Sequence, residues 1–265
     1  MDVLRRNNVR VVGATDGPTM VLAHGFGCDQ QMWRFVTPEF EASHRVVLFD
    51  HVGAGASDPT AFDPVRHSRL EGYAADLVEV VEAVGGGPVV LVGHSVSAMI
   101  GVLAARERPE LFDRLVLVGP SPRYVDDGDY RGGFSQKEID ELLETMDDNY
   151  LGWSAHIAPV IMGVPDRPEL GEELTASFCR TDPTLARRFA RTTFLSDNRA
   201  DLPEVPTPAL VVQCREDVIA PMEVGEYVRD HLPESELVVL DAVGHCPNLS
   251  APDQLVAAMK DYLAA

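Results

Sequence analysis

The sequence predicts an α/β protein with a mostly parallel central sheet, helices on both of its faces and one all-helical insertion. Short β-branched runs, typical of strands buried on both faces, alternate with helix-compatible segments over residues 19–119 and again over residues 209–263. Between these parts, residues 121–197 hold four amphipathic segments and no strand-like run. With 265 residues, of which 45% are hydrophobic, the chain can bury a large core.

The expected strands are short apolar runs that end in turn residues. They lie at residues 9–12, 19–23, 45–50, 88–92, 114–119, 209–213 and 236–240, with one more β-like piece before residue 9. Helices are expected at residues 70–84, 98–106, 222–231 and 252–263, and a further helix around Trp33, Phe35 and Phe40. Strands that alternate with helices in this way form parallel sheets covered on both sides.

The insertion is expected to form four helices. The first begins with a capping box at Ser135, and the fourth has Asp182 as its N-cap with a proline directly after it. We expect residues 1–120 and 198–265 to form the core and residues 121–197 to form a helical lid. Four short helices carry more large apolar residues than a small insertion can bury alone, so part of them is expected to line a pocket.

Charge and composition exclude several classes of protein. A formal net charge of −20 repels phosphate backbones and anionic membranes, so neither nucleic acid nor membrane is expected as a partner. The chain shows no run of 18 apolar residues and no signal peptide, and we expect a cytoplasmic location. Its four cysteines lie far apart without a CxxC pair, which indicates reduced thiols. No cluster has metal-ligand spacing, and the G-x-G at residues 53–55 lacks a third glycine, so we expect no metal and no cofactor.

Residues 88–106 predict a buried strand, a tight turn and a helix, with Ser95 at the turn. This context makes the match to the G-x-S-x-G motif credible, because the turn lifts the hydroxyl out of the sheet and directs a helix N-terminus at it. Ser97 stands where the motif has its last glycine, and it is nearly as small. A serine in such a place is more often a helix cap. The glycine before it and its expected partners favour a nucleophile.

Ser95, Asp217 and His245 each follow a predicted strand, in the chain order expected for this architecture. Carboxyl ends of parallel strands meet at one edge of a sheet, so these side chains are expected to converge. An imidazole activates a serine hydroxyl by taking its proton, and a carboxylate fixes the tautomer of that imidazole. The backbone N–H groups of Phe26 and Val96 are the candidate oxyanion donors, each worth on the order of 3 kcal/mol of barrier.

Other residues could take these roles. Glu216 adjoins Asp217 and stays an alternative, although the segment that follows favours Asp217. Asp241 lies too close to the last strand, and the side chain of His94 is expected to point away from the serine hydroxyl. His24 could be catalytic, but a polar residue that braces its glycine-flanked loop is the better interpretation.

The sequence resembles the α/β-hydrolase superfamily over nearly its whole length. More narrowly, it resembles the RsbQ-like branch, which also includes the plant karrikin and strigolactone receptors. The residues that carry this resemblance are His24 and the three residues after it, and the segments 93–101, 121–124 and 130–134. The last three are specific to the branch, and a serine at the position of Ser97 occurs within it.

The resemblance implies an α/β-hydrolase fold with a four-helix, V-shaped lid over an apolar pocket, and Ser95, Asp217 and His245 as its catalytic triad. By position, it also implies a pocket lined by Phe26, Val96, Phe134, Leu142, Trp153, Ile157, Leu174, Phe178, Phe194 and Ile219.

The function expected from these patterns is that of a serine hydrolase of small apolar esters or lactones, which works through an acyl-enzyme and serves as a stress-signalling ligand sensor. In the bacterial part of the branch the partner is a signalling phosphatase with a PAS domain, and the preference for arginine over lysine favours that role. Alternatives are a non-catalytic or slow butenolide-type receptor, and a metabolic esterase or perhydrolase. Dehalogenases and epoxide hydrolases are disfavoured because they carry Asp in the place of Ser95.

Overall fold

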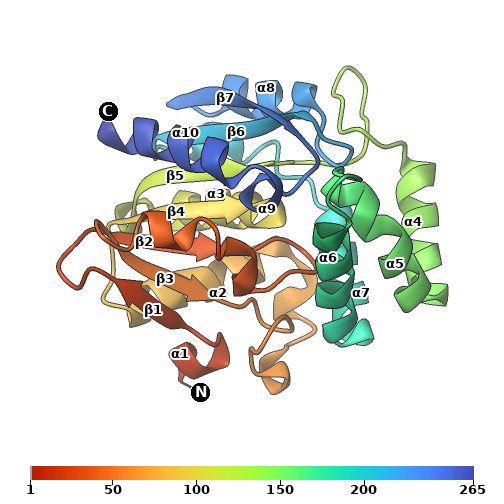
Figure 1. Cartoon of the computed structure of the whole chain (residues 1–265), viewed down its shortest axis with the longest axis horizontal. Helices are drawn as coiled ribbons and strands as arrows, with labels where there is room; N and C mark the ends of the chain where they lie inside the picture. Colours follow the sequence, from red (N-terminus) through yellow and green to blue (C-terminus); the bar gives the residue numbers. More distant parts are fainter. Residues whose placement is uncertain (1) are drawn as a thin grey trace.

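The computed structural model describes residues 2–265, and its centre is a seven-stranded sheet with the order β1-β3-β2-β4-β5-β6-β7 (Figure 1). Strands β2 to β7 pair in parallel, and β1 pairs antiparallel with β3 at one edge. The strands are β1 (Arg10–Gly13), β2 (Thr19–Ala23), β3 (Arg45–Phe49), β4 (Val89–His94), β5 (Phe112–Val118), β6 (Ala209–Glu216) and β7 (Ser235–Val243). The predicted mostly parallel sheet is therefore confirmed.

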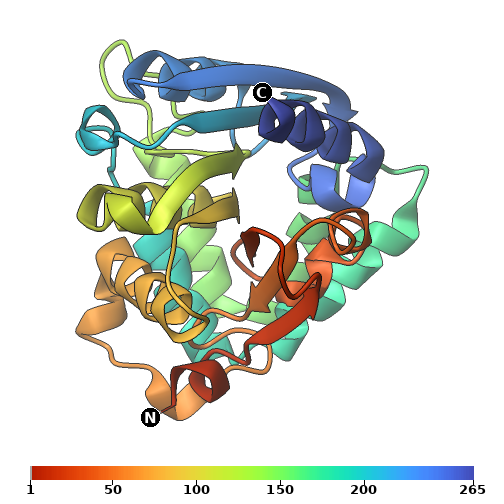
Figure 2. The same cartoon turned by 90° about the vertical axis from the view of Figure 1, so that its left-hand side faces the viewer.

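Side chains alternate between the two faces of this sheet, and helices cover both faces (Figure 2). In β4, Val89 and Leu91 join the core on the side of α2, α3 and α8, whereas Val90 and Val92 join the core on the side of α10. The helices are α2 (Leu70–Ala83), α3 (Val96–Glu107), α8 (Met222–His231), α9 (Pro247–Ser250) and α10 (Pro252–Ala264). Burial on both faces explains why the central strands are continuous apolar runs.

Four more helices connect β5 to β6 and gather beyond one end of the sheet (Figure 1). They are α4 (Gln136–Asp148), α5 (Tyr150–Met162), α6 (Pro168–Arg180) and α7 (Pro183–Phe194). The predicted caps are present: Ser135 and Glu138 form a capping box, and Asp182 accepts hydrogen bonds from the first turn of α7. The four predicted helices are therefore confirmed, while their separation as a lid domain stays a prediction.

Two local predictions were wrong. The segment before residue 9 is not β-like but forms a short helix, α1 (Val3–Arg6), because the Asp2 carboxylate caps it by accepting from the Leu4 amide. The helix expected around Trp33 is two short 3-10 turns, η1 (Gln30–Trp33) and η2 (Thr37–Glu39), since Pro38 interrupts the segment. The other 3-10 turns are η3 (Pro59–Ala61), η4 (Arg66–Ser68), η5 (Pro109–Leu111) and η6 (Leu202–Glu204). Among residues 2–265, no helix is both long enough and apolar enough to cross a bilayer.

Candidate active site

Ser95 occupies a strained turn between β4 and α3. Its backbone has φ 57° and ψ −122°, a conformation that L-residues rarely adopt. The turn also needs Gly93, because a Cβ at that position would lie 2.4 Å from the carbonyl oxygen of Ser97. The tight approach of strand and helix raises the serine side chain above the end of the sheet, as the sequence motif predicts.

The side chains of Ser95, His245 and Asp217 form one continuous hydrogen-bonded line. The Ser95 hydroxyl donates to Nε2 of His245 over 2.7 Å, and Nδ1–H of His245 donates to Oδ2 of Asp217 over 2.7 Å. The three residues come from the segments that follow β4, β7 and β6, and all three side chains are buried. The fold thus joins pairs that are 150 and 28 positions apart in sequence, in the arrangement that activates a serine.

The surroundings of Asp217 keep its carboxyl group ionised. Burial alone would raise its pKa, but the ring of His245 and the backbone N–H groups of Ile219 and Ala220 outweigh burial and lower the pKa. These two amides donate to Oδ1 over 2.8 and 3.2 Å, while Oδ2 stays free for the imidazole. A buried negative charge held in this way can orient His245 and stabilise its protonated form.

The alternative residues lie elsewhere. Glu216 is exposed at the end of β6, and Asp241, within β7, accepts a hydrogen bond from Arg215 over 3.0 Å. Nε2 of His94 donates to the backbone carbonyl of His245 over 2.7 Å, so this ring supports the histidine loop rather than the serine hydroxyl. None of the three takes part in the line that ends at Ser95.

The two candidate oxyanion donors are free to bind a ligand oxygen. Val96 is the first residue of α3, where a helix leaves its N–H groups without an intrahelical partner. Phe26 lies in the loop after β2, and neither amide donates to any group within residues 2–265. Their role as an oxyanion hole stays a prediction.

A small cavity lies beside Ser95, and about 30 Å³ of it is open to the centre of a water-sized molecule. Five predicted lining residues border it: Phe26, Leu174, Phe178, Phe194 and Ile219. Five others do not border it: Val96, Phe134, Leu142, Trp153 and Ile157. Trp153 packs behind the wall, with its ring centroid 5.4 Å from that of Phe178, and Phe134, Leu142 and Ile157 are half-buried at the margin of the same core.

Other residues of the cavity wall were not predicted from the sequence. These are Cys28, His94, Tyr124, Ile161, Thr193 and Cys246. Several of them adjoin residues that had been singled out: Cys28 follows the glycine-flanked loop, Tyr124 ends the segment 121–124, and Cys246 follows His245. Proximity in sequence to a motif was the signal that could have found them.

Comparison with known proteins shows the family of this chain. The model of the alpha/beta hydrolase family matches residues 20–258, which is most of the sequence. The chain belongs to the α/β-hydrolase family. This α/β hydrolase also resembles a hydrolase from Oleispira antarctica in its structure, with a TM-score of 0.96 and 40% sequence identity over 99% of this chain and 96% of that one. The predicted fold class is thereby confirmed.

Several curated relatives of the hydrolase are plant esterases and receptors. A probable esterase of Oryza sativa subsp. japonica is 42% identical over 97% of this chain and 95% of its own length. A strigolactone esterase of Arabidopsis thaliana is 42% identical over 99% of this chain and 98% of its own length. The karrikin insensitive 2 receptor CA of Petunia hybrida is 40% identical over 97% and 95%. These relatives confirm the resemblance to the plant receptors, and they fit a hydrolase or a ligand receptor.

The polar groups in the cavity wall of the hydrolase differ in what they offer a ligand. The hydroxyl of Tyr124 is buried and has no hydrogen-bond partner of normal geometry within residues 2–265. Burial raises its pKa, which the neighbouring Ser95 hydroxyl partly opposes, so it stays a neutral hydrogen-bond donor. Burial also raises the pKa of the Cys28 thiol to about 12 and that of Cys246 well above its ordinary value. Both thiols are therefore neutral and unsuited to nucleophilic attack.

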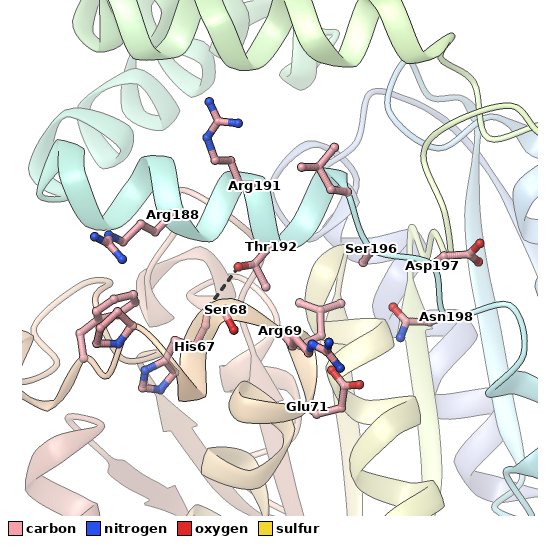
Figure 3. A pocket seen from close by; sticks show the side chains of 14 residues that line it. His67, Ser68, Arg69, Glu71, Arg188, Arg191, Thr192, Ser196, Asp197 and Asn198 are labelled. Carbon is pink, nitrogen blue, oxygen red and sulfur yellow. Dashed lines mark hydrogen bonds between the residues drawn. The ribbon is translucent and has the colours of Figure 1, made fainter.

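A surface cleft of the hydrolase beside α7 lies apart from this cavity. It has a volume of about 470 Å³ and separates α7 from the segment around η4 and the start of α2 (Figure 3). Thr192 donates to the carbonyl of His67 over 3.1 Å across its floor, and Ser95, Asp217 and His245 do not line it. The described part of the chain, residues 2–265, also holds no group of three or more His, Cys, Asp and Glu side chains that could bind a metal ion.

Proposed function

We propose that this α/β hydrolase cleaves small apolar esters or lactones, with Ser95 as the nucleophile, His245 as the general base and Asp217 as the residue that orients it. The observation that carries this proposal is the unbroken line of two 2.7 Å hydrogen bonds that ends at the cavity. Hydrolase and esterase relatives of similar length support the reaction class.

The mechanism follows from this geometry. The Ser95 oxygen attacks the carbonyl carbon while Nε2 of His245 takes the hydroxyl proton. The amides of Phe26 and Val96 stabilise the oxyanion of the tetrahedral intermediate. The intermediate collapses to an acyl-enzyme, and His245 returns the proton to the departing alkoxide. A water molecule, deprotonated by His245, then attacks the acyl carbon. This second tetrahedral intermediate collapses to release the acid, and His245 returns the proton to the Ser95 oxygen.

The wall of the cavity supports small, apolar and uncharged substrates. Phe26, Phe178 and Phe194 line it, and a chain with net charge −20 disfavours anions. A volume near 30 Å³ holds about two water molecules by the usual measure, so a lactone requires displacement of wall residues. Since Ile161, Phe178 and Phe194 belong to α5, α6 and α7, we propose that residues 121–197 act as a lid.

A sensing role is the second candidate, and the closed cavity favours it. A ligand that fills the cavity has to move helices whose outer faces form the surface of the protein, so occupancy alters what a partner can contact. The relative named as a karrikin receptor supports binding as the functional event. A metabolic esterase would instead turn substrate over rapidly. The stress-signalling role, the PAS-domain phosphatase as partner and the cytoplasmic location stay predictions.

The variant Ser95→Ala tests the hydrolase directly. Hydrolysis of p-nitrophenyl acetate should fall by roughly 10⁴-fold or more, because removal of the nucleophile leaves only binding and oxyanion contributions. Ser154→Ala is a matched control, since Ser154 is equally buried and its hydroxyl donates to the Tyr150 carbonyl within α5. Unchanged turnover in Ser95→Ala would refute the assignment of the nucleophile.

A binding experiment separates the sensor from the metabolic enzyme. Ser95→Ala removes turnover but keeps the cavity wall, so a sensor should still bind a butenolide and show altered hydrogen exchange on α4 to α7. An enzyme without a sensing role should bind the same butenolide without altered exchange on α4, none of whose residues borders the cavity.

A further inference from the structure

We propose that a buried hydrogen-bond circuit of His24, His51 and Ser97 positions the two oxyanion donors of this hydrolase relative to each other. The inference rests on the proposed function and deepens it. It concerns three polar side chains that do not line the cavity, yet are fully buried.

Ser97 joins the two structural pieces that carry the donors. Its hydroxyl donates to the backbone carbonyl of His24 over 2.5 Å, and it accepts from Nε2–H of His51 over 2.7 Å. Ser97 is the second residue of α3, whose first residue supplies the Val96 amide. His24 directly follows β2 and precedes the loop that supplies the Phe26 amide. A glycine, which the usual motif has at this position, would provide no such link.

His24 fixes the direction of the Phe26 amide. Nε2 of His24 accepts from the backbone N–H of His51 over 3.1 Å, so the ring proton resides on Nδ1. Nδ1–H then donates to the carbonyl of Gly25 over 2.8 Å. The Gly25–Phe26 peptide is trans, and in a trans peptide the C=O and the following N–H point in opposite directions. Holding the Gly25 carbonyl on His24 therefore turns the Phe26 amide to the opposite side, away from that ring.

His51 completes the circuit, but one of its two ring nitrogens is left without a hydrogen-bond partner among the described residues. It is fully buried, and its Nδ1 has no hydrogen-bond partner within residues 2–265. A hydrocarbon side chain would avoid that unpaired nitrogen, so the benefit of an imidazole here is its Nε2–H bond to Ser97. Burial, and next the neighbouring His24, lower the pKa of His51 well below its ordinary value. The ring thus stays a neutral hydrogen-bond donor at neutral pH.

The circuit makes the three residues positioning residues rather than catalytic ones. Oxyanion stabilisation depends on donors held within a fraction of an ångström of the developing charge. If the Ser97 link is lost, α3 and the Phe26 loop are free to separate, while the Ser95, His245 and Asp217 line remains intact. The expected loss is therefore confined to the transition state.

The first test is Ser97→Ala with Ser154→Ala as the matched control. In Ser97→Ala, kcat for p-nitrophenyl acetate should fall about tenfold, a part of the roughly 10²–10³-fold lost when an oxyanion donor is deleted. KM should change less than about twofold, and the acidic limb of the pH–rate profile should not move, because His245 is untouched. Rates are referred to active sites titrated with a fluorophosphonate, so that partial unfolding does not count as lost catalysis.

Two variants of His51 test the same circuit without changing Ser97. His51→Gln places an amide N–H near the position of Nε2 and should recover most of the wild-type kcat, whereas His51→Leu should lose as much as Ser97→Ala. The inhibition constant of a trifluoromethyl ketone, whose adduct carries an oxyanion, should rise in proportion to the loss in kcat/KM across the variants.

The outcomes separate this inference from the proposed function. Wild-type turnover that does not depend on Ser95 overturns both. Turnover that depends on Ser95, but is unchanged in Ser97→Ala and His51→Leu, overturns the positioning circuit alone. A shifted pH profile, or a loss that appears only in stability and in the number of titrated sites, also overturns it.

Discussion

His94 should limit the stability of this hydrolase in acid. Its ring is 2% exposed, and Nε2 donates to the carbonyl of His245 over 2.7 Å. Nδ1 faces Gly25 so closely that a Cβ there would lie 2.5 Å from it, and no group within residues 2–265 could accept a second ring proton. Burial, and next the neighbouring His245, lower the pKa of His94 to about 3. A drop in pH should therefore destabilise the fold through this residue.

The size of the effect follows from linkage. The ordinary value, 6.5, applies to the unfolded chain, so as the pH falls the unfolded state binds a proton before the folded state does. The stabilising contribution is complete above pH 6.5 and is lost progressively as the pH falls toward 3. At pH 5 the loss spans about 1.5 pH units, and at 1.36 kcal/mol per unit it amounts to about 2 kcal/mol. His51 and Asp217, whose pKa values are also lowered, change stability in the same direction.

Urea unfolding of the wild type and of His94→Gln, near pH 7 and near pH 5, measures this contribution. A glutamine can place its amide nitrogen where Nε2 lies and donate to the carbonyl of His245, but it does not titrate. His51 and Asp217 are present in both proteins, so the difference between them isolates His94. The wild type should lose about 2 kcal/mol more than the variant on acidification. Equal losses in the two proteins would show that His94 does not limit stability in acid.

Two further predictions concern the carboxylate and the loop after β2. Asp217→Asn should lower kcat by roughly 10⁴-fold, because an amide favours the wrong imidazole tautomer, while exposed Glu216→Gln should change it less than about twofold. The reverse pattern in steady-state assays would assign the role to Glu216. Gly27→Ala should destabilise the fold by more than about 2 kcal/mol, since φ is +72° and the new Cβ would lie 1.7 Å from the ring of Phe178. Gly86→Ala, with φ +77° and open space, measures the backbone part alone in the same unfolding assay.

The sheet and the convergence of the three site residues could be predicted from sequence because both depend on local patterns. A β-branched run followed by glycine fixes a strand end, and parallel strands share the edge at which they end. The convergence of Ser95, Asp217 and His245 could be predicted without knowledge of packing, from which loops follow which strands. The structure shows the hydrogen bonds between these side chains. Their catalytic roles stay proposals that the assays above test.

The cavity wall could not be predicted in the same way. Helical periodicity identifies the apolar face of α5, but Trp153, Ile157 and Ile161 all lie on that face. Which of them reaches the cavity depends on the angle at which α5 crosses its neighbours, and only Ile161 does so. The prediction for the start of the chain was wrong for another reason. A four-residue helix has no periodicity to read, and the Asp2 cap decided it.

The residues proposed to carry out catalysis and the residues proposed to control ligand entry lie in different parts of this molecule. The hydrogen-bonded line and the His24, His51 and Ser97 circuit lie on the loops that follow β2, β3, β4, β6 and β7 and on the first turn of α3, which the sheet holds in place. Much of the wall that closes the cavity lies on α5, α6 and α7. Substitutions such as Phe178→Leu can thus change which ligand enters without moving the reacting atoms. Such a division lets one fold serve either as an esterase or as a sensor, because the fate of the bound ligand and the motion it causes are set by separate residues.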